Sequence, residues 1–203
     1  MTLHRAPETS RATYQDVLDA PEHMIAEILN GRLHLQPRPR SRHALACSAL
    51  GSEIGGPFHF RPEGPGGWWI LYEPEIHLGE DVLVPDLAGW RRETLTSMPD
   101  VAFLEQTPDW VCEVLSPSTS GRDRGEKRDL YRDHGVSHLW LVDPEARVLE
   151  AFELTGDNSV LRLAASGDDA VAIPPFDAVK LDLSALWLPS LEAEGGAAPA
   201  KPL

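Results

Sequence analysis

The chain has 203 residues, of which 18 are lysine or arginine and 32 are aspartate or glutamate, so its net charge is -14 at pH 7. This balance argues against broad affinity for polyanions, although a bound cation or a local basic strip can still attract nucleic acid to a cleft. Two cysteines argue against a disulfide framework. The N-terminus has no signal-peptide core and no apolar stretch approaches the roughly 18 residues of a membrane span, so we expect a cytoplasmic protein.

The length suits a single domain with terminal extensions. Residues 1–12 and 190–203 are rich in small, polar and proline residues, a composition typical of disordered segments. Residues 13–189 are therefore expected to form one folded domain between two disordered ends.

The first half of the chain predicts a hairpin between two helices. After a short helix near residues 13–20, two strand-like runs at 24–29 and 32–36 flank Asn30-Gly31, a strong signal for a type I′ hairpin. Residues 41–54 follow with helical spacing, an N-capping serine and a glycine-proline stop, and predict an amphipathic helix.

The middle and the end of the chain predict a mixed sheet. Strands are expected at 68–72, 75–78 and 82–90, as a meander, and the nearly all-apolar run 110–115 suits a central strand covered on both faces. A polar helix over 122–134 and an apolar strand over 137–143 come next. An antiparallel extension is expected from 148–154, 160–164 and 170–173. The fold class is therefore α/β or α+β, with a mixed central sheet flanked by helices.

Glu113 interrupts the apolar run 110–115, where a carboxylate without a partner loses several kcal/mol of solvation or takes up a proton. A hard divalent cation held by carboxylates would compensate this burial. A structural ion pair with a buried arginine or lysine would do the same. The run alone leaves both interpretations open.

Asp86 is a second carboxylate in an apolar segment, because it lies within the strand-like run 82–90. The alternative is that Pro85-Asp86 is simply a turn, since the same dipeptide occurs at Pro99-Asp100 and Pro108-Asp109. Only Asp86 has strand-forming residues on both sides, which favours it as a metal ligand.

Lys127 shares one stripe of its predicted helix with Asp123, Leu130 and Tyr131, the stripe that holds the main apolar residues. Its side chain is therefore expected to point toward the sheet, over the strand that carries Glu113. Two carboxylates and a lysine form the smallest set for metal-assisted phosphodiester hydrolysis. The carboxylates hold the ion, and the lysine positions a water or stabilises developing negative charge.

Several ordered motifs resemble the Uma2 family, formerly a domain of unknown function, over roughly residues 13–155. The matching segments are Ala26 to Gly31, Pro85-Asp86, Glu113 to Thr119, Asp123-(x3)-Lys127-(x3)-Tyr131 and Gly135 to Asp143. The resemblance implies a PD-(D/E)xK restriction-endonuclease-like fold. Asp86 and Glu113 would be its metal-binding acids, and its catalytic lysine would have moved to the helix as Lys127.

Three further residues match the family motifs as accessory positions: Glu27, Asp123 and Tyr131. Glu27 would supply another carboxylate or serve as the structural partner of a buried arginine. Tyr131 would donate to a phosphate or pack in the core. A lone histidine on a helix, such as His43 near the start of the long helix, is more often partly exposed than bound to a phosphate, so it is not part of the predicted set.

The functional hypothesis is an endonuclease dependent on Mg²⁺ or Mn²⁺ that hydrolyses nucleic acid, with DNA as the expected substrate. A homodimer is expected by analogy with nucleases that cut both strands. The alternative is a catalytically inactive nuclease-fold protein that acts as a binding or assembly module. A weaker interpretation takes Ser116, Ser118, His134 and Asp143 as a hydrolase triad, although a G-x-S-x-G elbow is missing.

Overall fold

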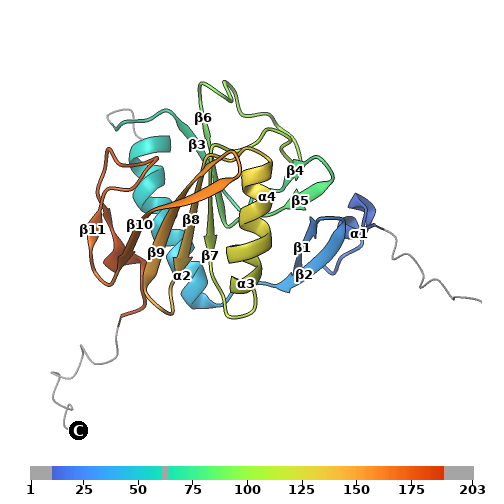
Figure 1. Cartoon of the computed structure of the whole chain (residues 1–203), viewed down its shortest axis with the longest axis horizontal. Coiled ribbons are helices and arrows are strands. Elements are labelled where there is room, and N and C mark those ends of the chain that lie inside the picture. Colours follow the sequence, from blue (N-terminus) through green and yellow to red (C-terminus); the bar gives the residue numbers. More distant parts are fainter. Residues whose placement is uncertain (1–10, 61–63, 190–203) are drawn as a thin grey trace, which may run out of the picture.

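The computed structural model describes residues 11–60 and 64–189 (Figure 1). The predicted disordered ends lie outside these residues, except for 11 and 12. The described chain contains a six-stranded mixed sheet in the order β10-β9-β8-β7-β6-β3 and a four-stranded sheet in the order β2-β1-β5-β4. A mixed sheet with flanking helices and an N-terminal hairpin is what the sequence predicts, so the fold class is confirmed.

The N-terminal hairpin forms as predicted. After α1 (Tyr14–Leu18), strands β1 (Met24–Leu29) and β2 (Arg32–Pro37) pair antiparallel. The turn residues Asn30 and Gly31 have φ values of 52° and 74°, the left-handed conformation that a type I′ turn requires at both positions.

The first long helix and its extension lead from the hairpin into the six-stranded sheet. Helix α2 (Ser41–Gly55) continues into one π-helical turn, η1 (Gly56–Phe60). Strand β3 (Trp68–Tyr72) then forms one edge of the sheet.

The predicted strand 82–90 is wrong, because it splits into β5 (Asp81–Leu83) and β6 (Leu87–Arg91) in two different sheets. Pro85 offers no N–H to a strand ladder, and the N–H of Val84 donates to a side chain, Glu27 Oε1, at 2.9 Å. The predicted meander forms only in part, because the two halves of its third strand belong to different sheets.

Strand pairing around this break combines a local hairpin with pairs between more distant segments. β3 pairs with β6, while β4 (Ile76–Leu78) pairs with β5. β5 also meets β1, where Ile28 lies opposite Val82, so the break at Pro85 joins the hairpin sheet to the main sheet.

Strand β7 (Trp110–Val114) is central, as its apolar sequence predicts. It pairs antiparallel with β6 and parallel with β8 (His138–Asp143). The connection between β7 and β8 carries a helical segment in three parts, α3 (Ser120–Arg122), the π-helical η2 (Asp123–Lys127) and α4 (Arg128–Asp133).

The C-terminal extension is partly as predicted. β9 (Val148–Thr155) and β10 (Asn158–Ser166) continue the sheet antiparallel. The predicted third strand does not join them, because β11 (Ala170–Val171) pairs with β12 (Leu181–Asp182) in a separate two-stranded sheet. This region and η3 (Leu183–Leu186) contribute apolar side chains to the core around α2. Burial of these side chains explains why the end of the described chain packs against the helix.

Two apolar clusters fill the two faces of the main sheet. One contains α2 with Trp110, Cys112 and Val114 of β7, and the other contains α4 with Val111 of the same strand. Since strand side chains alternate between faces, Glu113 projects toward the α4 side. None of the helices in the described ranges is long and apolar enough to cross a membrane.

Candidate active site

Asp86 lies at the bend that separates β5 from β6, directly beside the end of β7. Its Oδ2 accepts a hydrogen bond of 2.7 Å from the backbone N–H of Val114. Leu87 is opposite Cys112 in the antiparallel register, so the next positions outward bring Asp86 and Glu113 together. Asp86 is therefore in a bend between two strands, beside the second predicted acid.

Asp86 and Glu113 line one cleft between the hairpin, α2 and the loop that follows β7. His43, Glu73 and Asp123 line the same cleft. The break at Pro85 is what turns the Asp86 carboxylate into this space rather than into a strand ladder.

Glu113 is almost completely buried, with 4% of its surface exposed. Its Oε1 lies 2.6 Å from Nζ of Lys127 and accepts a hydrogen bond of 2.5 Å from the hydroxyl of Tyr131. Lys127 and Tyr131 are themselves 1% and 0% exposed. The helical stripe thus faces the sheet as its spacing predicts, and the contact between Tyr131 and Glu113 was not predicted.

Glu27 completes this buried cluster from β1. Its Oε1 lies 2.9 Å from Lys127 Nζ and accepts the N–H of Val84, while its Oε2 is buried without a hydrogen-bond partner. Its structural partner is therefore a lysine rather than the arginine that the sequence analysis considered. Lys127 bridges two carboxylates from different sheets and lies behind Glu113.

The pKa shifts in the cluster follow from burial and from its excess of negative charge. Burial raises the pKa of Glu113 well above its usual value, and the neighbouring Lys127 opposes this shift. Burial lowers the pKa of Lys127, but Glu113 and Glu27 outweigh it, so the ammonium form is favoured strongly. Burial also raises the pKa of Asp123.

The donor set suits a hard divalent cation. The carboxylates of Glu27, Asp86 and Asp123 all act on Glu113 against a single lysine, Lys127, so negative charge is in excess in this cluster. Oxygen ligands with net negative charge are what Mg²⁺ and Mn²⁺ prefer. Asp86 and Glu113 line the open side and are the residues that would hold the ion.

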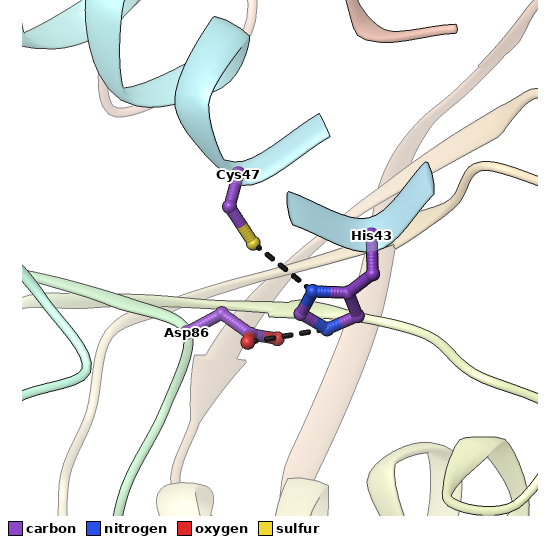
Figure 2. Close-up of side chains that lie close together, drawn as sticks. All are labelled: His43, Cys47 and Asp86. Carbon is purple, nitrogen blue, oxygen red and sulfur yellow. Dashed lines mark hydrogen bonds and ion pairs between the residues drawn. The ribbon is translucent and has the colours of Figure 1, made fainter. Parts of the chain in front are cut away.

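His43 and Cys47 lie next to Asp86, and neither is in the set predicted from the sequence. His43 Nε2 lies 3.2 Å from Asp86 Oδ1, and Cys47 Sγ lies 3.4 Å from His43 Nδ1 (Figure 2). Burial lowers the pKa of His43, but Asp86 raises it further, so the shift is upward. The one local signal was the i, i+4 spacing of His43 and Cys47 on a helix, since Asp86 is remote in sequence.

The hydrolase triad is not assembled in the described structure. The hydroxyls of Ser116 and Ser118 form a hydrogen bond of 3.0 Å with each other. His134 Nε2 lies 3.0 Å from Oδ2 of Asp81. Asp143 accepts backbone N–H groups of the following turn. These contacts are those of loop and helix-end residues, so the triad interpretation is wrong.

The chain is similar to a known family and to a solved structure. The model of the Uma2 family, described as "Putative restriction endonuclease", matches residues 11–184. A crystal structure described as a putative nuclease belonging to DUF820 from Anabaena variabilis ATCC 29413 has a TM-score of 0.68 and 22% sequence identity. That similarity covers 86% of this chain and 97% of the other, and at this identity it shows the fold. The search of curated proteins returned no match.

The family match spans most of the chain, including the hairpin, both acids and the helix with Lys127. It agrees with the mixed sheet and with the resemblance of the sequence motifs. The chain belongs to the Uma2 family of restriction-endonuclease-like proteins.

Proposed function

We propose that this protein is an endonuclease that cleaves DNA with Mg²⁺ or Mn²⁺ held by Asp86 and Glu113. The observation that carries the proposal is the shared cleft of these two acids, backed by a buried lysine bonded to one of them. When bound, the ion would polarise the scissile phosphate and lower the pKa of a water molecule.

The residues of the chain have distinct parts in this proposal. Lys127 lies behind Glu113, so it acts by fixing the Glu113 carboxylate and favouring its charged form rather than by touching the substrate. The hydroxyl of Tyr131 donates a hydrogen bond to the same oxygen of Glu113, Oε1. With Oε1 held from behind by two donors, the orientation of the carboxylate toward the cleft is set before any ligand arrives.

A basic groove next to the cleft supports a nucleic-acid substrate. Between Glu27 and Glu53 the sequence contains no acidic residue but carries four arginines, at positions 32, 38, 40 and 42. Arg38, Arg40 and Arg42 line a groove that shares His43 with the cleft. Phosphates bound along this groove would lead a strand to the acids in spite of the net charge of -14.

Cleavage of plasmid and short duplex DNA in Mg²⁺ or Mn²⁺ tests the proposal. We expect cleavage by the unmodified protein and a loss of about a hundredfold or more in Asp86→Asn and Glu113→Gln. Glu150→Gln is a matched control, because Glu150 pairs with Arg124 outside the cleft. Equal cleavage by the Glu113 variant, or none by the unmodified protein, would refute the proposal.

A second candidate is a catalytically inactive module that acts in binding or assembly, favoured by the net charge of -14, which weakens the attraction to polyanions. Calorimetric titration with Mg²⁺ and Mn²⁺ separates the two candidates. If the protein is the proposed endonuclease, the unmodified chain binds the ion and the Asp86→Asn variant does not. If it is the inactive module, neither binds the ion. Sedimentation of the unmodified protein tests the expected homodimer independently.

A further inference from the structure

A histidine side chain stands next to the first predicted acid. His43 and Cys47 lie one turn apart on α2, and both side chains point from the helix toward the bend that carries Asp86 (Figure 2). The ligand atoms of the three residues lie within 4.8 Å of one another. The side chains of His43 and Asp86 are mostly buried but still reachable by solvent, with 11% and 13% of their surface exposed.

The distance between His43 and Asp86 matches that of two ligands on one ion. Ligand atoms about 2.1 Å from a metal are about 3.0 Å apart in cis-octahedral geometry and about 3.4 Å apart in tetrahedral geometry. His43 Nε2 and Asp86 Oδ1 are 3.2 Å apart, between these values. Asp86 Oδ2 is already held by the N–H of Val114, which leaves Oδ1 for the ion.

Cys47 lies beside the other nitrogen of the imidazole ring. Its sulfur is 3.4 Å from Nδ1, whereas Asp86 contacts Nε2. A metal-bound histidine commonly has its second nitrogen held by a neighbouring group, which fixes the ring orientation and the tautomer. Cys47 is placed to hold Nδ1 while Nε2 faces the ion.

Other pairs of histidine and carboxylate in the described structure lack these surroundings. His134 pairs with Asp81 and His77 with Glu75, at 3.0 and 2.8 Å. Neither pair lines the cleft that holds Glu113 and Asp123. The pair formed by His43 and Asp86 is the one with further carboxylates at hand to complete a coordination sphere.

We propose that His43 Nε2 is a ligand of the same ion as Asp86, and that the site therefore takes a first-row transition ion such as Mn²⁺, Co²⁺ or Zn²⁺ in preference to Mg²⁺. Imidazole nitrogen is a good ligand for these ions, while Mg²⁺ favours a sphere of oxygen atoms. The inference rests on the proposed metal site and adds its ion class, with Cys47 as a positioning residue.

Calorimetric titration of the full chain with Mn²⁺ and with Mg²⁺ tests the ion class. In His43→Ala we expect the Kd for Mn²⁺ to rise by at least about tenfold, and the Kd for Mg²⁺ to change less, so that the preference for Mn²⁺ narrows. His134→Gln is the matched control and should leave both constants unchanged. Circular dichroism of each variant verifies that the fold is retained.

The outcomes separate this inference from the proposed function. If His43→Ala binds both ions like the unmodified protein while Asp86→Asn binds neither, His43 is not a ligand, and the proposed metal site stands. The inference is likewise overturned if His43→Ala loses cleavage with an unchanged Kd for Mn²⁺, because the histidine then acts on the substrate. If neither ion binds the unmodified protein, both proposals fail together.

Co²⁺ used as a spectroscopic probe tests the place of the thiol. We expect the visible bands of a bound Co²⁺ ion without the near-ultraviolet charge-transfer band of a cobalt thiolate. A thiolate band that disappears in Cys47→Ser would contradict the geometry, because it would put the ion on the Nδ1 side of the ring. Cys47→Ser should retain the ion with a Kd raised by about tenfold or more.

Discussion

Replacement of Lys127 by methionine perturbs the centre of the buried cluster. Lys127 is 1% exposed, and its Nζ contacts carboxylate oxygens of Glu113 at 2.6 Å and of Glu27 at 2.9 Å. Methionine keeps most of the apolar stem in place but removes the charge. The variant would then have two buried carboxylates from different sheets without a positive partner.

The expected cost follows from this burial. Removing one partner of a buried ion pair destabilises a protein by about 3 to 5 kcal/mol. Since burial raises the pKa of Glu113, protonation of this group limits the loss and keeps it within that range. In a domain of this size about 1 kcal/mol lowers the Tm by roughly 2 to 4 °C, so Lys127→Met should lower it by about 10 °C.

Urea and thermal unfolding followed by circular dichroism measure this loss. Arg124→Met is the control, because Arg124 pairs with Glu150 at a more exposed position, where an ion pair contributes at most about 1 kcal/mol. If Lys127→Met lowers the free energy of unfolding by less than about 1 kcal/mol, the buried ion pairs do not stabilise the fold as argued. A double-mutant cycle with Glu27→Gln should show a coupling above about 0.5 kcal/mol, and independent effects would refute this stabilisation as well.

Three further predictions concern single contacts. Tyr131→Phe removes the donor to Glu113 Oε1, so the free energy of unfolding should fall by about 1 to 3 kcal/mol. The loss of cleavage activity should be smaller than in Glu113→Gln. The double variant Arg40→Ala, Arg42→Ala should weaken DNA binding in Ca²⁺ equally for all sequences and lower the salt slope by about one per lost phosphate contact. Burial lowers the pKa of His59 below 6.5. The contribution of His59 to stability is therefore fully present above pH 6.5, and it is lost as the pH falls through the pKa of the folded state. Urea unfolding at several pH values measures this loss.

Each of these predictions has its own control. Tyr72→Phe removes a hydroxyl from a residue that is half exposed, and it should leave stability unchanged within about 0.5 kcal/mol. Arg162→Ala removes an arginine that pairs with Glu153 away from the groove, so a similar loss of DNA binding there would contradict the groove. His59→Gln should flatten the acid dependence of stability, and an unchanged dependence would show that other groups produce it.

The local parts of the structure were predictable because neighbouring residues decide them. Asn30-Gly31 has the two positive φ values that its turn requires, and the helical spacing of Lys127 and Tyr131 predicted the face that meets the sheet. The apolar run around Glu113 predicted a central strand for the same reason. Hydrophobic periodicity is a property of short segments, and it survives in the fold.

The residues from 82 to 90 show where such reasoning stops. Their alternation is that of one strand, yet the chain breaks at Pro85 and enters two sheets, because Val84 donates to Glu27 instead of to a strand. No pattern within these residues reveals a partner 57 positions away. The position of Asp86 was therefore derived from a wrong strand, although its neighbour across the sheet is the expected Glu113.

The sequence by itself determined the hairpin, the central strand and the inward face of the helix that carries Lys127. Only the tertiary structure decided that Lys127 joins Glu27 to Glu113, and that His43 meets Asp86 across 3.2 Å. The physical reason is that such contacts depend on strand register and on the packing of α2 against the sheet. Both are set by the whole core, in which residues far apart in the chain share one buried space.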